Sequence, residues 1–349
     1  MPEIEIAGNR IGTGHPCFII AEAGVNHNGS LDLARALIDA AAAADADAVK
    51  FQTFKTRNVI SATAPKAAYQ QQTTDTKESQ LEMVERLELP FEAFRELAAY
   101  CGERRVIFLS TPFDDESADF LAQLGVAAFK IPSGEITNLP LLRRIARKSR
   151  PMLVSTGMCH LGEVETAVRL FEECGNRDFA LLHCVSNYPS APADSNLRAM
   201  RTMAEAFGVP VGYSDHTLGG EVALAAVALG ACVIEKHLTL DRALPGPDHR
   251  ASLEPEAMAA LVRGIRDVEA ALGDGRKRPV ASEANTASVA RKSLVSARAI
   301  KAGEVVTESM VAIKRPGTGL PPASIELVIG RRARGEIAAD RVLDLTMFE

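Results

Sequence analysis

Two histidines, 21 positions apart, each close a short apolar run that predicts a β-strand. His216 lies in YSDHT, after the run VPVGYSD, and His237 lies in IEKHLT, after the run ACVIEK. Two imidazoles at the ends of consecutive strands can face one divalent cation, and they leave its other positions to water and a substrate oxygen. The chain has no GxGxxG, P-loop or GxSxG motif, so these histidines are its main cofactor signal.

Polar side chains stand at the ends of the other predicted strands as well. Lysines supply positive charge and hydroxyls donate to phosphate oxygens, so such a ring suits a small phosphorylated acid. Fold stability alone does not explain the ring, because burying an unpaired charge costs several kcal/mol. The ring consists of Glu22, Lys50, Gln52, Ser110, Thr111, Lys130, Ser133, Glu135, Ser155, Thr156, His183, Ser186, Tyr188, Ser214, Asp215, His216, Glu235, Lys236 and His237.

Some of these polar residues have plainer interpretations. Lys236 stands beside Glu235, and we interpret it as half of an ion pair with that neighbour. Asp215 and His216 are adjacent on a strand, where successive side chains point apart, so we expect separate roles for them. Asp248 follows the last strand in the turn GPDHRAS. It could bind a sugar hydroxyl or act as a base, or it could serve only the turn.

Alternating segments position these residues. Eight β-then-α units in about 270 residues predict a (β/α)8 TIM barrel, whose active site lies at the carboxyl ends of the strands. A doubly wound sheet is the main competitor, but no glycine fingerprint follows the first strand. Helical spacing occurs in segments such as 31–44, 91–105, 163–175 and 255–273. The runs that predict strands are 18–24, 47–53, 106–113, 127–135, 151–157, 179–186, 209–215 and 232–240.

Two further segments depart from this alternation. Residues 54–90 form a long, Gln-rich insertion after the second strand, and we predict that it forms a wall of the active site. Residues 273–288 are polar, basic and contain Gly and Pro, which indicates a linker. We therefore predict a barrel domain over 1–275, a linker over 276–288 and a small domain rich in strands and turns over 289–349.

Bulk composition excludes several classes of protein. The net charge of −6 makes nucleic acid an unexpected partner. The six cysteines form no CxxC pair, which favours reduced core residues of a cytoplasmic protein. The N-terminal MPEIEIAGNR has no apolar signal-peptide region, and the longest apolar run, 222–234, is too short to span a bilayer. No membrane association is predicted.

A set of strings in this order resembles the bacterial sialic acid (nonulosonic acid) synthase family. The resemblance extends from about residue 15 to 335, and the set is far more specific than any one string. The strings are IAEAGVNHNGS (20–30), VKFQTFK (49–55), STPFD (110–114), FKIPSGEITNLP (129–140), STGM (155–158), SDHT (214–217), IEKHLTLD (234–241), GPDHRASLEP (246–255) and KRPGTG (314–319).

The resemblance implies a fold and a reaction. The barrel should precede an antifreeze-like (SAF) domain, and two chains should form a domain-swapped homodimer. Phosphoenolpyruvate should condense with an N-acylated mannosamine-type sugar, giving a nine-carbon 2-keto acid and phosphate. Carbon 3 of phosphoenolpyruvate attacks the sugar aldehyde, water adds to carbon 2, and phosphate leaves by C–O cleavage. A divalent metal is required, Mn²⁺ foremost, with Mg²⁺ or Co²⁺ as alternatives.

The resemblance also implies roles for individual residues. His216 and His237 match the metal ligands, and Arg315 matches an arginine that reaches the partner subunit's site. Glu22 is the candidate for proton handling or for orienting the sugar. The position of Ser186 varies within the family. The phosphoenolpyruvate positions are Lys50, Thr111, Lys130, Ser133, Ser155 and Ser214, and those around the sugar are Glu22, Gln52, Tyr188 and Asp248.

Several alternatives stay open at this point. The strings resemble both N-acetylneuraminate and N,N'-diacetyllegionaminate synthases, and AEAGVNHNG with VGYSDHT favours the latter. Pseudaminate synthases are less similar in the GPD segment. A Schiff-base aldolase using Lys130 or Lys50 is an alternative enzyme. An ice- or sugar-binding protein built on the C-terminal domain is the non-enzyme alternative, but it leaves the ring of polar residues unexplained.

Overall fold

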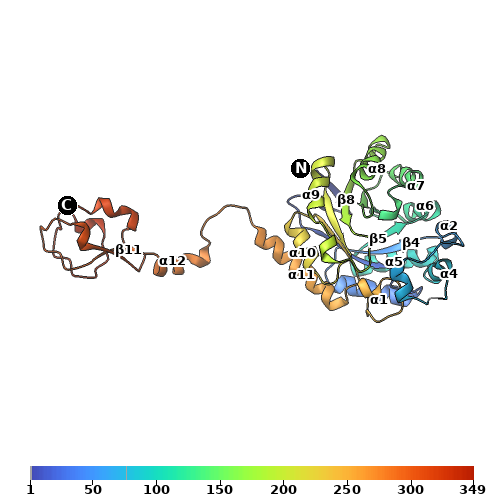
Figure 1. Ribbon diagram of the computed structural model, residues 1–349, viewed down its shortest axis with the longest axis horizontal. Helices are drawn as coiled ribbons and strands as arrows, with labels where there is room; N and C mark the ends of the chain where they lie inside the picture. Colours follow the sequence, from blue (N-terminus) through green and yellow to red (C-terminus); the bar gives the residue numbers. More distant parts are fainter. Residues whose placement is uncertain (1, 76) are drawn as a thin grey trace. The chain divides into compact units, whose positions relative to one another are not determined.

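The structure, a computed structural model, describes residues 2–75 and 77–349. It divides into two compact units, Met1–Gly273 and Asp274–Glu349 (Figure 1). All six cysteines lie within the described residues and are free. Among the described helices, none combines the length and the apolar character that crossing a bilayer requires.

The first unit is a closed barrel of eight parallel strands, as predicted. Its last strand pairs with its first, which sets His237 beside Glu22. The predicted strand over 127–135 is shorter in the structure, because Pro132 has no N–H to donate and a 3-10 turn follows over Ser133–Glu135. The strands are β3 (Phe18–Gly24), β4 (Ala48–Thr53), β5 (Ile107–Pro112), β6 (Phe129–Ile131), β7 (Met152–Ser155), β8 (Phe179–Cys184), β9 (Val211–Asp215) and β10 (Val233–His237).

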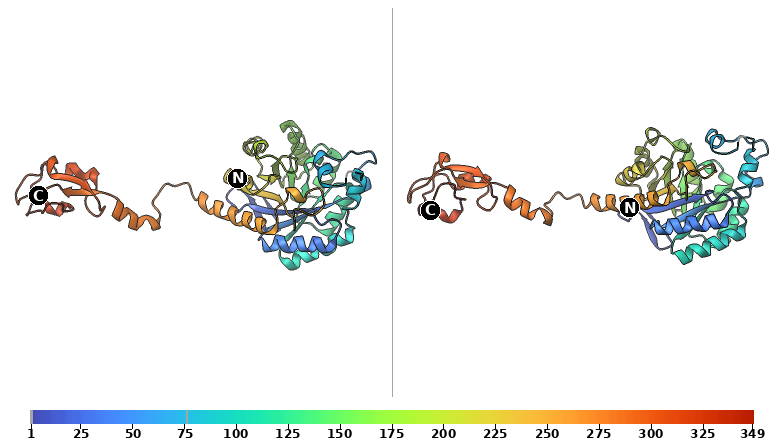
Figure 2. Two further views of the ribbon diagram at one scale, coloured as in Figure 1. Left: turned by 60° about the horizontal axis from the view of Figure 1, so that its bottom comes forward. Right: turned by 90° about the horizontal axis from the view of Figure 1, so that it is seen from below.

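Helices surround the strands, and Figure 2 shows the strands inside the helical ring. Each helix turns an apolar stripe toward the sheet; in α1, for example, Ala34, Leu37, Ile38 and Ala41 are buried. The surrounding helices are α1 (Leu31–Ala43), α5 (Phe91–Arg104), α6 (Asp115–Leu124), α7 (Leu139–Ala146), α8 (Leu161–Glu173), α9 (Arg198–Phe207), α10 (Glu221–Ala228) and α11 (Pro255–Leu272).

A hairpin that the sequence analysis did not predict closes the amino-terminal end of the barrel. It pairs β1 (Glu3–Ile6) with β2 (Asn9–Gly12). Ile4, Ile6 and Ile11 are buried against strand-start residues such as Phe18 and Val233. The opposite, carboxyl-terminal end remains for the functional site.

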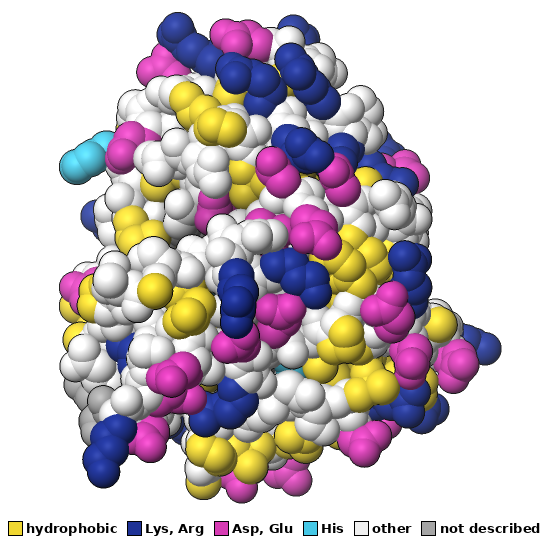
Figure 3. Space-filling view, turned by 90° about the vertical axis from the view of Figure 1, so that its right-hand side faces the viewer, with side chains coloured by type: hydrophobic (Ala, Val, Ile, Leu, Met, Phe, Trp, Pro, Cys, Tyr) yellow, Lys and Arg dark blue, Asp and Glu magenta, His cyan; other side chains and the backbone are white. Residues whose placement is uncertain are grey.

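The insertion after β4 folds into three short helices, α2 (Thr56–Val59), α3 (Ala68–Thr73) and α4 (Gln80–Glu85). Thr76, inside this insertion, lies outside the described residues. Glu88, near the end of the insertion, accepts hydrogen bonds from the N–H and the hydroxyl of Thr56 near its start, both at 2.8 Å, and these bonds join the two ends of the insertion. Figure 3 shows the face that carries α2 and α4, where hydrophobic side chains gather between charged ones.

The second unit is small and has little regular structure. A short helix, α12 (Ala284–Ala290), begins in the segment predicted as a linker (276–288) and ends two residues beyond it. Two antiparallel strands follow, β11 (Ser293–Ser296) and β12 (Val311–Lys314), with several 3-10 turns. The unit has a hydrophobic core of its own, which includes Leu294, Ile300, Val306, Val328, Leu343 and Phe348.

Candidate active site

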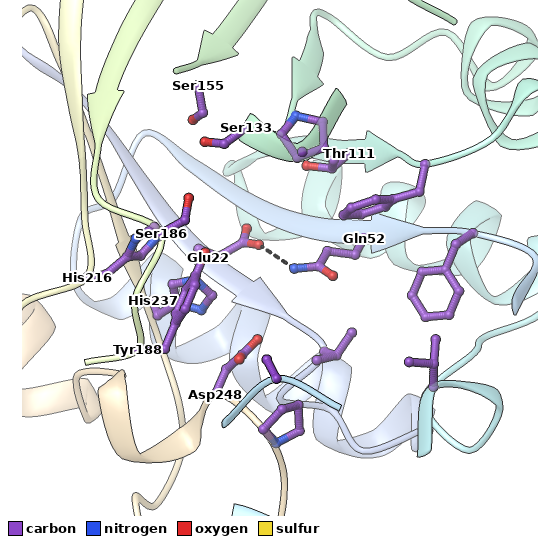
Figure 4. A pocket seen from close by; sticks show the side chains of 18 of the residues that line it. Glu22, Gln52, Thr111, Ser133, Ser155, Ser186, Tyr188, His216, His237 and Asp248 are labelled. Atoms are coloured by element: carbon purple, nitrogen blue, oxygen red, sulfur yellow. Dashed lines mark hydrogen bonds between the residues drawn. The ribbon is translucent and has the colours of Figure 1, made fainter. Parts of the chain in front are cut away.

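A cavity of about 430 Å³ opens at the carboxyl-terminal end of the barrel (Figure 4). Every strand contributes to it, because parallel strands bring their carboxyl ends to one face. Arg315, the remaining residue to which the family resemblance gives a role, belongs to the second unit, where its side chain is exposed. Six other residues of the predicted ring do not line the cavity: Ser110, Glu135, Thr156, His183, Asp215 and Lys236. The residues with a role implied by the resemblance that line the cavity are Glu22, Lys50, Gln52, Thr111, Lys130, Ser133, Ser155, Ser186, Tyr188, Ser214, His216, His237 and Asp248.

Four buried charges form a network at the floor of the cavity. Lys50 Nζ lies 2.8 Å from Glu22 Oε2 and 3.7 Å from Glu235 Oε2, and Lys130 Nζ lies 3.7 Å from Glu235 Oε1. Lys50 also donates to Thr111 Oγ1 at 3.0 Å, and Lys130 donates to Ser155 Oγ at 2.7 Å. Both lysines therefore point their ammonium groups at hydroxyls that surround one space.

Glu235 belongs to the predicted ring but was given no role there beyond an ion pair with Lys236, although it lies near both Lys50 and Lys130. It also accepts a hydrogen bond from Ser214 Oγ at 3.0 Å. The alternation of side chains along the strand indicates this position, because Glu235 and His237 are two residues apart in β10 and therefore share a face. Counting back from His237 would have identified it.

The network sets the protonation of its members. Burial raises the pKa of Glu22 to about 7, against the charge of Lys50, and the Glu235 charge adds to the rise. Burial opposes the charge of Lys50, but the Glu22 and Glu235 carboxylates outweigh it and hold the Lys50 pKa above its usual range. Burial lowers the pKa of Lys130. Glu22 can therefore exchange a proton near neutral pH.

The two predicted histidines face the cavity side by side. Their ring centroids are 5.5 Å apart. Tyr188 packs against both rings, and its ring centroid lies 4.2 Å from that of His216 and 5.7 Å from that of His237. His216 Nδ1 lies 2.7 Å from the Val185 carbonyl oxygen. Because a carbonyl only accepts, Nδ1 carries the proton and Nε2 keeps its lone pair.

The histidines fit a divalent cation. Burial lowers the pKa of His216 to about 4 and that of His237 well below its usual range, so both rings are neutral, as metal ligation requires. His237 Nδ1 is buried and has no hydrogen-bond partner within the described residues. Over the same residues, no group of three or more His, Cys, Asp or Glu gathers as a metal cluster. The protein would thus supply two ligands and leave the rest to water and substrate.

The interpretation of Lys236 as the partner of Glu235 was wrong. Lys236 lies on the opposite face of β10, where its Nζ is 2.7 Å from Asp215 Oδ2, and both side chains are fully buried. Neighbouring strands place these two residues in register. Asp215 therefore supports the barrel wall while His216 faces the cavity, which agrees with the separate roles predicted for them.

The insertion supplies a wall of the cavity, as predicted, with polar residues that sequence reasoning missed. Tyr69 lies with its ring centroid 5.2 Å from that of Tyr188, and Gln70 and Gln80 also line the cavity. Burial raises the pKa of Asp248 to about 6. Burial and the Asp248 charge raise the pKa of Tyr69. No periodic pattern in the insertion marks Tyr69, because its position depends on how the insertion folds.

Comparisons with known proteins agree with this geometry. Residues 37–277 match the NeuB family and residues 291–349 match the SAF domain. The N,N'-diacetyllegionaminic acid synthase of Campylobacter jejuni is 49% identical over 93% of this chain and 98% of its own length. The enzyme of that name from Legionella pneumophila is 46% identical over 95% of this chain and 94% of its own length.

A solved structure gives the same result. The N-acetylneuraminic acid synthetase of Leptospira borgpetersenii, 38% identical, superimposes with a TM-score of 0.72 over 81% of this chain and 94% of its own. The predictions of a TIM barrel, of a SAF domain and of the family are confirmed. The chain belongs to the NeuB family of sialic acid synthases.

Proposed function

We propose that this chain condenses phosphoenolpyruvate, a 2,4-diacetamido-2,4,6-trideoxymannose and water to N,N'-diacetyllegionaminate and phosphate. The supporting observation is the buried ring of Lys50, Lys130 and hydroxyls beside two neutral histidines. The diacetamido sugar is favoured over N-acetylmannosamine because the two legionaminic acid synthases are 49% and 46% identical, against 38% for the neuraminic acid synthetase.

Phosphoenolpyruvate occupies the lysine side of the cavity in this proposal. Lys50 and Lys130 neutralise its phosphate and carboxylate, and Thr111, Ser133, Ser155 and Ser214 donate hydrogen bonds to its oxygens. Without substrate, Glu22 and Glu235 balance the two lysines. The lysines are thus oriented before the anion binds.

The sugar occupies the side of the cavity with Gln52, Tyr188 and Asp248. Carbon 3 of phosphoenolpyruvate forms a bond to the aldehyde carbon, and water then adds to carbon 2. The C–O bond to phosphate breaks, and the lysines neutralise the departing phosphate. Glu22, with a pKa of about 7, can give a proton to the sugar oxygen or take one from the water.

His216 and His237 would hold the divalent cation, Mn²⁺ foremost. When bound, this cation supplies a Lewis acid for the aldehyde oxygen. The Val185 carbonyl keeps the His216 ring in the tautomer that presents Nε2. Tyr188 packs against both rings and limits their rotation.

We further propose that the working form is a homodimer in which Arg315 completes the partner's site and contacts the N-acyl group. Residues 274–349 contain 13 Lys or Arg and 9 Asp or Glu, whereas residues 1–273 contain 26 and 36. Opposite net charges favour docking of the second unit of one copy on the barrel of another. Mixing Arg315→Ala with an inactive His237→Gln variant tests this, since mixed dimers should regain activity in one of their two sites.

The reaction is tested by mixing the protein with phosphoenolpyruvate and Mn²⁺ and adding N-acetylmannosamine or the diacetamido sugar. We expect phosphate release and a 2-keto acid by NMR with the diacetamido sugar, abolished by EDTA. His216→Gln should lose at least 100-fold in kcat, and His160→Gln, at an exposed histidine, should not. Full metal-dependent turnover by His216→Gln and His237→Gln would refute the metal assignment.

The Schiff-base alternative predicts a different outcome. Borohydride would then trap a keto acid on Lys130 or Lys50, whereas the proposed reaction forms no imine. The Lys50 pKa, held above its usual range by two carboxylates, disfavours the neutral amine that an imine needs.

A further inference from the structure

The cavity has two chemically unlike sides. The strand ends contribute charged and hydroxyl side chains, whereas the side formed by the insertion and neighbouring loops is mostly apolar. We call this side the apolar wall. It consists of Val25, Phe54, Val59, Ile60, Met83, Val84, Leu87 and Phe113.

The apolar wall is a packed structure and does not depend on a ligand for its shape. Val25, Phe54 and Leu87 are buried in a small hydrophobic cluster of their own. The rings of Phe54 and Phe113 pack edge to face, with their centroids 6.3 Å apart. Ser79 and Glu82 form a capping box that fixes the start of α4. A preformed wall can select a substrate, because its shape is set before binding.

One polar atom within this side lacks a partner. Gln80 lines the cavity beside Met83 and Val84, and its Oε1 is buried with no hydrogen bond to any described residue. An unsatisfied buried acceptor costs about 1–3 kcal/mol, and a ligand that donates to it recovers that cost. Apolar surface around a single amide acceptor matches an acetamido group, which has one N–H and one methyl.

We propose that Gln80 and the apolar wall bind the acetamido group at carbon 4 of the sugar. Gln80 Oε1 accepts the N–H, and the wall packs against the methyl. This inference rests on the proposed function, in which the aldehyde carbon lies at the histidines. The sugar chain then extends from the strand ends toward the insertion, so its later carbons reach the wall.

Charge supports the same choice of substrate. Among the described residues that line the cavity, the cations are Lys50 and Lys130, and both lie at strand ends. A sugar phosphorylated at its distal carbon therefore finds no positive side chain at the wall. A hydroxyl in place of the acetamido group leaves the apolar surface of the wall uncovered, and it is too small to fill the space that the acetamido group occupies.

The test compares two sugars that differ only at carbon 4. They are 2,4-diacetamido-2,4,6-trideoxymannose and 2-acetamido-2,6-dideoxymannose, which carries a hydroxyl there. The ratio of their kcat/KM values isolates the carbon 4 group. Gln80→Leu keeps the size but removes the acceptor, and we expect it to lower this ratio by about tenfold with the KM for phosphoenolpyruvate unchanged.

A conservative variant and a control complete the experiment. Gln80→Glu keeps an acceptor and should retain most of the ratio. Gln123→Leu, at an exposed glutamine on α6, should leave it unchanged. An unchanged ratio in Gln80→Leu, or equal losses in both Gln80 variants, would overturn the inference. Wild-type protein that turns over neither sugar would instead refute the proposed function, and the inference with it.

Discussion

The buried ion pair between Lys236 and Asp215 supports the barrel behind the histidines, and its removal should have a measurable effect. Lys236 Nζ donates to Asp215 Oδ2 at 2.7 Å and to the Thr217 carbonyl oxygen at 2.5 Å. Asp215 Oδ1 accepts from the Thr217 N–H and hydroxyl at 2.9 and 2.8 Å. The pair thus fixes the residues on both sides of His216.

Lys236→Met keeps the apolar stem but leaves a buried carboxylate without its cation. Breaking a buried pair in this way costs about 3–5 kcal/mol. In a unit of this size 1 kcal/mol shifts the melting temperature by about 2–3 °C, so we expect a fall of roughly 6–15 °C. Asp215→Asn leaves the lysine unpaired and should cost a similar amount. The double variant removes both charges and should recover much of the loss.

Thermal melting followed by far-UV circular dichroism measures all three variants. Arg169→Met is the control, because it removes the exposed Arg169–Glu165 pair and should change stability by no more than about 1 kcal/mol. The reasoning is refuted if the double variant loses the sum of the two single losses, because the two charges would then act independently. A Lys236→Met variant that melts like the wild type would refute it as well.

Two further predictions concern the site and its surroundings. A Cβ on Gly157 would lie closest to Ser186 Oγ, and also 2.8 Å from Cys184 Sγ and 2.9 Å from Ser133 Oγ. Gly157→Ala must therefore displace these side chains, and it should raise the KM for phosphoenolpyruvate at least tenfold while the melting temperature stays near that of the wild type. An unchanged KM would show that phosphoenolpyruvate does not need Ser133 and Ser186 at these positions. Burial, with a smaller contribution from His249, lowers the pKa of His27 to about 4, so below pH 6.5 the unfolded chain takes up a proton that the folded chain does not. This proton should contribute about 3 kcal/mol to the fall in stability between pH 6.5 and 4, in addition to the contributions of other buried histidines such as His216. In urea titrations the fall for His27→Gln should therefore be smaller than that for the wild type by about this amount, and an identical pH profile would contradict the assignment.

The barrel and most of the ring could be predicted because regular structure converts sequence position into spatial position. Residues at the ends of parallel strands meet on one face, so the sequence alone predicts that the lysines, hydroxyls and histidines lie together. The error at Lys236 has the same origin. It came from pairing sequence neighbours, although adjacent side chains on β10 point to opposite faces of the sheet.

Other parts could not be predicted for physical reasons. The strands of the amino-terminal hairpin have only four residues each, too few for a convincing alternation. Tyr69 and Gln80 lie in an insertion without a clear period, and Tyr69 takes its place through a contact with the distant Tyr188. Arg315 is in the other unit, so no strand register relates it to the ring.

The residues that carry out the reaction and the residues that select the sugar lie on different kinds of structural element. The lysines, Glu22, Glu235 and His237 stand on strands, where backbone pairing to neighbouring strands fixes each side chain to its position, and His216 directly follows β9. The apolar wall and Gln80 stand on short helices and loops, held by a small hydrophobic cluster and by Glu88. Substitutions in the wall can therefore change which sugar fits without moving the charges that carry out the reaction. A single barrel can in this way keep one condensation and exchange the sugar that it uses.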